Sequence, residues 1–297
     1  MFKGSFTALI TPFKGGKVDE DAFARLVEWQ IKEGTHGLVP CGTTGESPTL
    51  STEEHKRVIA LCVDIAKKRV PIVAGCGSNS TEEAIDLSRF SKDAGADATL
   101  QVMPYYNKPT QEGLYLHMKA INDAVDLPII LYNVPVRTIT DMSVATMARC
   151  AKLKNIVGVK DATANVARVT QQRNACGEKF VQLSGEDGTC LGFMAHGGVG
   201  CISVTSNIAP RLCADFQNAC LAGDWKKALV LQDKLMPLHD SMFCETNPAP
   251  VKYAASRLGL CAEDCRLPLA PLTEASRKLV DKALADIGLT KRAAAAE

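Results

Sequence analysis

The sequence predicts a parallel (β/α)8 barrel that is followed by a short all-helical extension. Eight short apolar or β-branched runs recur between residues 6 and 204, and helix-like stretches separate them. Successive run ends in the middle of the chain lie about 24 to 29 residues apart, which is the length of one strand, one helix and two short loops. Eight such units that end near residue 224 favour a closed barrel over an open sheet.

The expected strands are short and almost wholly apolar, as strands that are covered on both faces should be. They occupy residues 6–10, 37–39, 70–74, 98–103, 128–132, 156–160, 180–184 and 200–204. The expected helices among them occupy residues 19–32, 51–68, 80–94, 111–124 and 143–151. The second of these begins Ser51-Thr52-Glu53-Glu54, in which a serine at the N-cap precedes a glutamate by three positions, the pattern of a capping box.

After Asp224 the strand-like runs stop, and three helices are expected at residues 225–243, 250–258 and 273–287. The prolines that mark the turns between them are Pro248, Pro250, Pro268 and Pro271. We therefore assign residues 1–224 to the barrel and residues 225–297 to a C-terminal helical domain. Such an appendage has too little core to work alone, so packing or assembly is its expected role, and residues 293–297 are expected to fray.

Composition excludes several classes of partner. The 297 residues are 46% hydrophobic and carry a net charge of +1, which offers no electrostatic footprint for nucleic acid or an anionic membrane. No apolar stretch reaches transmembrane length, and the first strand begins so close to Met1 that no signal or transit peptide is expected. The sequence therefore predicts a cytoplasmic protein with a small-molecule partner.

Cysteine and histidine usage predicts neither disulfides nor a metal site. The twelve cysteines include no Cys-x-x-Cys pair, and those in apolar settings, such as Cys62 and Cys150, are expected to be reduced and to pack as small hydrophobes. The five histidines are scattered, and none forms a metal-type pair with a carboxylate at helical spacing.

Lys160 is the most informative residue of the chain. It follows the apolar run Ile156-Val157-Gly158-Val159, so its ammonium group is expected at a strand end inside a packed core. An ammonium group that is removed from water gives up its proton more readily, and the neutral amine is a nucleophile that forms Schiff bases with carbonyls. The alternatives are an edge lysine with only its stem buried, or a buried ion pair with the adjacent Asp161.

Other chemistry-bearing residues are expected at the same rim, because the C-terminal ends of barrel strands face one site. In chain order these ends carry Thr11, Cys41-Gly42-Thr43-Thr44-Gly45-Glu46, Gly75, Pro104-Tyr105-Tyr106, Tyr132-Asn133-Val134-Pro135, Lys160-Asp161, Ser184-Gly185-Glu186-Asp187 and Ile202-Ser203. One lysine, several hydroxyls and glycine-lined backbone suit carbon–carbon bond chemistry through an imine, in which the iminium accepts electrons and the hydroxyls move protons.

Each of these elements also has a purely structural reading. The loop from Gly42 to Gly45 is either an ordinary strand-to-helix turn or an anion site in which backbone N–H groups and hydroxyls hold a carboxylate or phosphate. Tyr132 could pack inside the barrel, and the segment after Ser184 could be a solvated loop. Because all of these residues are expected at one rim of the barrel, a catalytic role is favoured over a purely structural one.

Three segments resemble the signatures of the class I pyruvate-dependent lyases, and within them the dihydrodipicolinate synthase family. These are Gly42-Thr43-Thr44-Gly45-Glu46, Tyr132-Asn133-Val134-Pro135 with Arg137-Thr138 following, and Gly158-Val159-Lys160-Asp161. The resemblance extends over nearly the whole chain, through Glu245-Thr246-Asn247-Pro248 and Pro250-Val251-Lys252. Relatives that act on sialic acid or keto-deoxy sugar acids tend to differ at the second threonine of the loop or to lack the arginine, whereas this chain keeps Thr44 and Arg137.

The resemblance implies a condensation of pyruvate with L-aspartate 4-semialdehyde in lysine biosynthesis, with no cofactor beyond the imine on Lys160. It implies that Thr43 and Thr44 hold the pyruvate carboxylate and that Tyr132 passes protons through Thr43 to Tyr106, which a neighbouring subunit donates across a dimer interface. It implies a substrate-binding set of Thr44, Arg137, Ile202 and Gly185, in which Arg137 orients the aldehyde, and a homotetramer built as a dimer of dimers.

The resemblance further implies feedback inhibition by L-lysine at a second site. The positions that match it are Ser47, Pro48, His55, Asn79, Glu83 and Tyr105. Enterobacterial members have a histidine where this chain has Thr52, so weaker inhibition is expected. Two other functions stay open on the sequence: an aldolase of the same superfamily that cleaves a 2-keto sugar acid, such as an N-acetylneuraminate or keto-deoxy-gluconate type, and a catalytically idle barrel that senses a metabolite.

Overall fold

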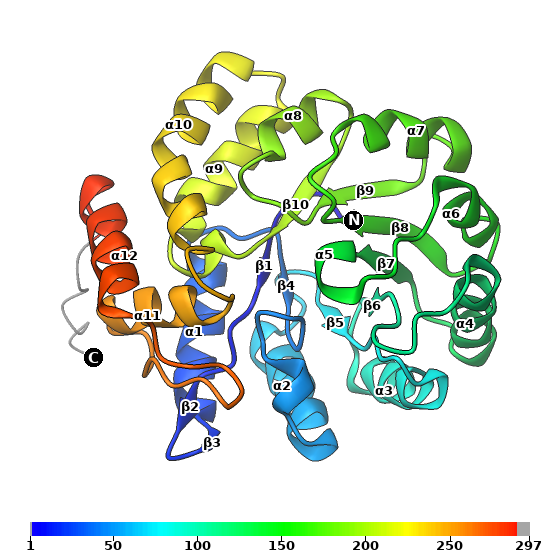
Figure 1. Ribbon diagram of the computed structural model, residues 1–297, viewed down its shortest axis with the longest axis horizontal. Helices are drawn as coiled ribbons and strands as arrows, with labels where there is room; N and C mark the ends of the chain where they lie inside the picture. The colour runs from blue at the N-terminus through cyan, green and yellow to red at the C-terminus, as the bar shows by residue number, and fades with distance from the viewer. Residues whose placement is uncertain (1, 290–297) are drawn as a thin grey trace.

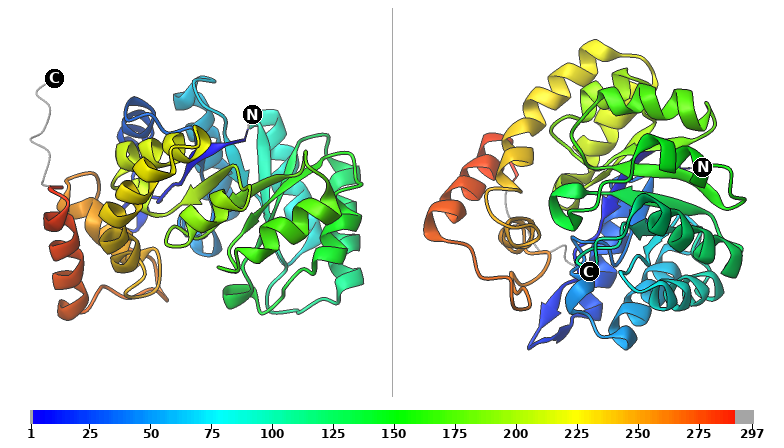
Figure 2. Two further views of the ribbon diagram at one scale, coloured as in Figure 1. Left: turned by 90° about the horizontal axis from the view of Figure 1, so that it is seen from above. Right: turned by 45° about the vertical axis from the view of Figure 1, so that its right-hand side comes forward.

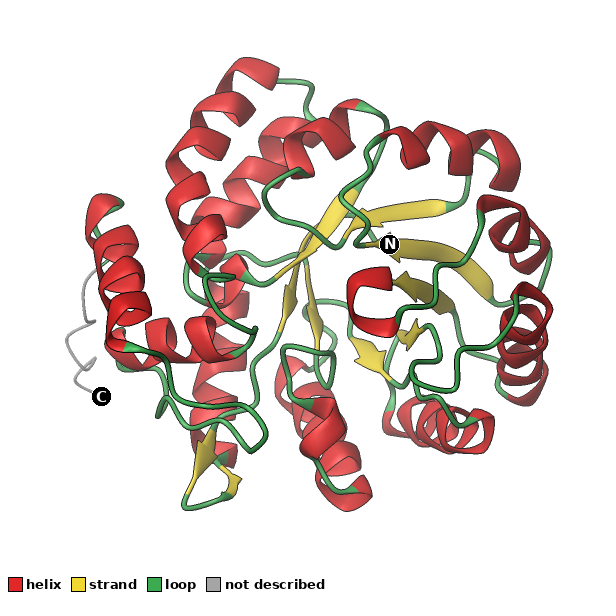
Figure 3. Ribbon diagram, in the orientation of Figure 1, coloured by secondary structure: helices red, strands yellow, loops and turns green. Residues whose placement is uncertain are grey.

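The computed structural model describes residues 2–289, and residues 293–297 lie outside that range. The sheet has eight parallel strands, and helices surround it (Figure 1; Figure 3). The strands are β1 Gly4–Ala8, β4 Gly37–Val39, β5 Val73–Gly75, β6 Ala98–Val102, β7 Ile129–Asn133, β8 Ile156–Asp161, β9 Val181–Ser184 and β10 Gly200–Ser203. Their hydrogen-bonded order is β4-β1-β10-β9-β8-β7-β6-β5.

The two ends of this sheet meet, which makes it a barrel. Leu38 in β4 forms a parallel bridge with Ile72 just before β5, and the Leu38 amide donates to the Pro71 carbonyl at 3.0 Å. The predicted (β/α)8 architecture is therefore confirmed. The eight predicted runs correspond to these eight strands in chain order, with ends that differ by up to three residues.

The outer ring begins with helices that alternate with the strands. These are α1 Glu20–Lys32, α2 Thr52–Ala66, α3 Thr81–Ala94, α4 Gln111–Ala124, α6 Val144–Cys150, α7 Ala167–Cys176, α8 Cys190–Ala195 and α9 Pro210–Leu221. Capping side chains fix where several of them start. Ser51 accepts from the Glu54 amide while Glu54 accepts from the Ser51 amide, so the predicted capping box is present at α2.

Short elements that the sequence reading did not include lie in the connections. They are the hairpin β2 Phe13–Lys14 and β3 Lys17–Val18, the helix α5 Pro135–Thr138, and the 3-10 turns η1 Ser47–Thr49 and η2 Thr205–Asn207. The hairpin turns through Gly15 and Gly16, which have φ angles of 59° and 78°, a region that favours glycine. Helix α5 follows β7 directly and carries Arg137 over the rim.

Three further helices follow the barrel, α10 Trp225–Ser241, α11 Ala249–Arg257 and α12 Glu274–Asp286, close to the predicted ranges. They lie on the side of α1 and α9, away from α4 to α7 (Figure 1; Figure 2). Their buried residues, including Leu235, Val251 and Val280, join one apolar cluster with residues of α1, α2 and α9. The extension is thus packed onto the barrel wall through a shared core.

A second apolar cluster fills the barrel interior and contains Phe6, Leu100, Tyr132, Leu183 and Ile202. Eight of the twelve cysteines are buried and the other four are partly buried, and all are free thiols. Within residues 2–289, no group of three or more His, Cys, Asp or Glu side chains is placed to hold a metal ion. In the same range, no helix combines the length and the apolar character needed to cross a bilayer.

Candidate active site

Lys160 lies in β8 with only 6% of its surface exposed. Parallel register pairs it with Tyr132 of β7 on one side and with Leu183 of β9 on the other. Its Nζ lies 4.2 Å from the centre of the Tyr132 ring, and within residues 2–289 it makes no hydrogen bond or ion pair. An amine in this setting is sheltered from water and unengaged, as a nucleophile requires.

One other lysine of residues 2–289 is buried, Lys252 of α11, and its surroundings differ from those of Lys160. Lys252 is fully buried, but it forms an ion pair with Glu46 and donates to the Asp264 carbonyl at 2.6 Å. Burial of a lysine is usually tolerated only with such a partner. Within residues 2–289 Lys160 has no such partner, which is the difference between the two buried lysines.

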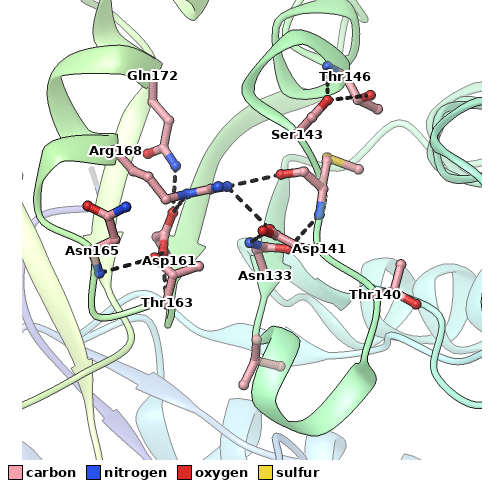
Figure 4. Close-up of polar contacts among 12 residues, drawn as sticks. Asn133, Thr140, Asp141, Ser143, Thr146, Asp161, Thr163, Asn165, Arg168 and Gln172 are labelled. Atoms are coloured by element: carbon pink, nitrogen blue, oxygen red, sulfur yellow. Dashed lines mark hydrogen bonds and ion pairs between the residues drawn. The ribbon is translucent and has the colours of Figure 1, made fainter.

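The ion pair between Lys160 and Asp161, which the sequence left open, is not formed. Asp161 instead accepts from Arg168 Nε at 3.0 Å and from Gln172 Nε2 at 2.5 Å, both on α7 (Figure 4). Arg168 also lies 3.6 Å from Asp141, which accepts from Asn133 Nδ2 at 2.7 Å. Because Asn133 and Asp161 directly follow Tyr132 and Lys160, this network ties the ends of β7 and β8 together.

The loop after β4 forms the next part of the site. Thr11 donates its hydroxyl to the Gly45 carbonyl at 2.7 Å, and Glu46 adopts a left-handed conformation with a φ of 56°. Thr44 is buried and Thr43 is half-buried. The Thr44 hydroxyl oxygen accepts from Asn247 Nδ2 at 3.1 Å, so a residue of the extension reaches this loop.

Backbone and apolar groups complete the floor. A Cβ atom on Gly185 would lie 2.7 Å from Ala162 Cβ and 3.0 Å from Lys160 Cε. Any larger residue at this position would therefore clash with the lysine side chain. Ile202 is buried in the interior cluster with Tyr132. Burial raises the pKa of Glu186, and the neighbouring Asp187 adds to that rise.

Two of the expected residues stand apart from the buried site. Arg137 is exposed on α5, and its Nη2 contacts the Asn247 carbonyl at 3.4 Å. Tyr106 is 95% exposed in a left-handed conformation with a φ of 69°, so its own chain does not bring it to the site. Within residues 2–289 no hydrogen bond joins Tyr132 to Thr43 or Thr43 to Tyr106.

A separate small pocket of about 120 Å³ lies beside α2 and α3 and is lined by five of the six residues expected at the lysine site. These five are Ser47, Pro48, His55, Glu83 and Tyr105, and the lining also contains Leu50, Thr52, Gly77, Ser78 and Leu87. Asn79 reaches its edge, because Asn79 Nδ2 donates to the Tyr105 carbonyl at 3.2 Å. Burial lowers the pKa of His55, and burial together with the Glu83 carboxylate raises the pKa of Tyr105.

Residues 1–287 match the model of the Dihydrodipicolinate synthetase family, which covers nearly the whole chain. The chain belongs to this family. A 4-hydroxy-tetrahydrodipicolinate synthase from Parvibaculum lavamentivorans is 66% identical over 289 residues, which are 97% of this chain and 99% of the relative.

Solved structures of the Dihydrodipicolinate synthetase family agree with this assignment. The chloride-inhibited dihydrodipicolinate synthase from Acinetobacter baumannii, complexed with pyruvate, is 49% identical with a TM-score of 0.95 and covers 97% of this chain and 100% of its own. The synthase from Cyanidioschyzon merolae with lysine bound is 35% identical with a TM-score of 0.94, over 97% and 99% of the two chains.

Three contacts of the site were missed by the sequence reading: the Glu46–Lys252 ion pair, the contact of Asn247 with Thr44, and the Asp161–Arg168 ion pair. Lys252 carried a usable signal, because Pro250-Val251-Lys252-Tyr253-Ala254 places a lysine in an apolar run, as at Lys160. The contact of Asn247 with Thr44 had no comparable signal in the sequence, since the two residues are 203 positions apart.

Proposed function

We propose that this protein condenses pyruvate with L-aspartate 4-semialdehyde to give 4-hydroxy-tetrahydrodipicolinate, the reaction of lysine biosynthesis by the diaminopimelate pathway. The observation that carries the proposal is Lys160, a buried lysine at a strand end that has no ion partner among residues 2–289. The names of the relatives at 57 to 66% identity support the same reaction.

In the proposed mechanism, the neutral Lys160 amine adds to the pyruvate ketone, and loss of water from the resulting carbinolamine gives an iminium ion. The iminium withdraws electrons, so a methyl proton leaves and an enamine forms. The enamine carbon attacks the aldehyde, whose oxygen takes up a proton. The amino group of the second substrate then displaces Lys160 by transimination, which closes the ring and frees the enzyme.

The other residues bind the substrates and move protons. Thr43 and Thr44 hold the pyruvate carboxylate through hydroxyl and backbone donors, and Arg137 presents a planar fork to the carboxylate of the aldehyde. Tyr132 exchanges protons through Thr43 with Tyr106 of a neighbouring subunit. Gly185 and Ile202 shape the floor under the imine. The reaction needs no cofactor beyond the imine itself.

We also propose a homotetramer, a dimer of dimers, that acts in the cytoplasm. Three large apolar side chains on the segments that follow β6 and β7 support an interface there: Tyr106, Val136 of α5 and Ile139 are 95%, 82% and 71% exposed. An apolar group of this kind beside a site marks a contact surface. It would carry Tyr106 into the partner's site.

Feedback inhibition by L-lysine at the small pocket is a further part of the proposal. Glu83 offers a carboxylate to an ammonium group, while Asn79 and Tyr105 offer polar atoms to the α-amino and carboxylate groups. Since Tyr105 adjoins Tyr106, a ligand there would disturb the proton path without occupying the pyruvate site. Thr52 lines the pocket where a histidine is found in enterobacterial members, and weaker inhibition is expected.

The decisive experiment is reductive trapping followed by coupled assays. Incubation with pyruvate and borohydride should add one reduced pyruvate adduct by intact mass, and Lys160→Ala should abolish it while the variant still folds. If no adduct forms, the remaining candidate function is that of a metabolite sensor without catalytic activity. An adduct without turnover of L-aspartate 4-semialdehyde, but with cleavage of N-acetylneuraminate or keto-deoxy-gluconate, would instead establish a 2-keto sugar acid aldolase.

A further inference from the structure

Asn247 contacts two of the three side chains proposed to hold substrate carboxylates, Thr44 and Arg137. Its side chain is buried and donates from Nδ2 to the Thr44 hydroxyl oxygen at 3.1 Å. Its main-chain carbonyl accepts from Arg137 Nη2 at 3.4 Å. Within residues 2–289, Asn247 Oδ1 is buried and has no hydrogen-bond partner, so Thr44 is the sole partner of this side chain.

The direction of the Thr44 contact determines what the hydroxyl can do. A threonine hydroxyl has one hydrogen to donate and two lone pairs to accept with. Because Asn247 supplies the donor in their contact, the Thr44 hydrogen remains available to another acceptor. A substrate carboxylate is such an acceptor, and a hydrogen bond to an anion is stronger than one to a neutral group.

Asn247 is itself held against the loop that it contacts. Five residues further along, Lys252 of α11 forms its fully buried ion pair with Glu46, two residues after Thr44. The second oxygen of Glu46 accepts from the Arg266 amide at 2.9 Å. Separation of a buried ion pair is costly, so the segment of the extension that carries Asn247 stays docked on the loop after β4.

We propose that Asn247 is a positioning residue for both substrates, and that two different atoms of Asn247 serve them. Its side-chain amide fixes the Thr44 hydroxyl as a donor to the carboxylate of pyruvate, and its carbonyl oxygen orients Arg137 toward the carboxylate of the aldehyde. The inference rests on the proposed function, and it gives the C-terminal extension a role in substrate binding.

Asn247→Ala tests the two contacts separately, because it removes the side-chain amide and keeps the main-chain carbonyl. The KM for pyruvate should rise about fivefold, as expected for one lost hydrogen bond, while the KM for L-aspartate 4-semialdehyde and kcat at saturation stay unchanged. Asn247→Asp should raise the KM for pyruvate further than alanine does. A carboxylate there accepts the Thr44 hydrogen and places a negative charge beside the substrate anion.

Thr44→Val tests the same hydrogen bond from the other partner. It should raise the KM for pyruvate alone, and adding Asn247→Ala to it should have no further effect. If Asn247→Ala does not fold, the isosteric Asn247→Asp decides the inference, because wild-type affinity in that variant would overturn it. Asn218→Ala is the control, because Asn218 is exposed on α9 and bonds to His36 just before β4, at the N-terminal end of the strands; both KM values should match the wild type.

Three results would overturn the inference: equal rises of both KM values in Asn247→Ala, wild-type affinity in Asn247→Asp, or independent effects of the Thr44 and Asn247 substitutions. Each of these requires an active wild-type enzyme. A wild type that traps no pyruvate or does not turn over the semialdehyde would refute the proposed function instead, so the two failures are distinguishable.

Discussion

At the residue scale, the geometry around Lys160 leaves little room for change. Gly185 lies so close that a Cβ atom would meet both Ala162 and the Lys160 stem. Ala162 Cβ is attached directly to the backbone just after β8, whereas the lysine stem can change rotamer, so the stem is the group expected to move. A displacement of about 1 Å at a reacting group can cost about a hundredfold in rate.

Gly185→Ala is therefore expected to fold and to slow borohydride-trapped imine formation by about a hundredfold. The matched control is Gly188→Ala, three residues away, where a Cβ atom would only make an ordinary contact at 3.6 Å with Glu186 Oε1. Single-turnover trapping measured by intact mass compares the two. Equal rates in both variants would show that Gly185 does not set the position of the lysine.

At the scale of elements, the network of Asp161, Arg168, Asp141 and Asn133 holds β7 against β8 (Figure 4). Arg168→Met should destabilise the protein by about 3 kcal/mol, because it leaves the buried Asp161 carboxylate without its cation. Asp161→Asn in the same chain should recover part of this loss. Urea unfolding measures both, with Arg149→Met as control, since Arg149 pairs with Glu112 in the open and should matter far less.

The pair of Glu54 and Arg266 predicts a pH-dependent link between α2 and the extension. The Arg266 hydrogen bond lowers the pKa of Glu54 to about 2 from its usual 4.5. The folded state binds the proton less tightly than the unfolded chain does, so this stabilisation is complete above pH 4.5 and is lost as the pH falls toward 2.

Glu54→Gln keeps the capping interaction but removes the charge, and it should lower Tm at neutral pH by about 2 °C because the pair is partly exposed. The difference from the wild type should shrink as the pH drops below 4.5. Glu53→Gln, on the neighbouring exposed position, is the control and should show no such trend. A pH-independent difference in thermal melts would argue against the charge.

The strands and most helices could be predicted because parallel barrel strands are continuous apolar runs and helix starts carry capping residues such as Ser51. The four-residue α5 is too short for any periodicity, and α7 has only Val169 and Gln172 buried, so it lacks an apolar stripe. Lys160 was found because a charge interrupts an apolar run. Contacts such as Asn247–Thr44 depend on how distant segments pack, which no local pattern encodes.

At the scale of the whole molecule, the pocket proposed to bind lysine and the interface proposed near Tyr106 are adjacent, because Tyr105 lines the pocket and Tyr106 follows it. Lysine at millimolar concentration and saturating pyruvate should inhibit the wild type partially, and Glu83→Ala should lose this response because the ligand's ammonium group loses its counter-charge. Glu82→Ala, exposed on the same turn of α3, is the control. Inhibition that is purely competitive with pyruvate and unchanged in Glu83→Ala would refute the second site.

Assembly should control activity if Tyr106 acts in a partner's site. Dilution to monomer should abolish turnover while the barrel stays folded, and Tyr106→Phe should lower kcat without changing the sedimentation of the assembly. Analytical ultracentrifugation with activity measured on the same samples checks this. A fully active monomer would exclude a contribution from the neighbouring subunit.

Alkylation of the buried thiols can be used to measure local unfolding of the protein. Burial raises the pKa of Cys76, just after β5, and of the partly buried Cys265, between α11 and α12 of the extension, to about 12 each. Only a thiolate reacts quickly with alkylating reagents, so at neutral pH each cysteine should be labelled only when its surroundings unfold. The order in which Cys265 and Cys76 become labelled would therefore show whether the extension detaches before the barrel opens.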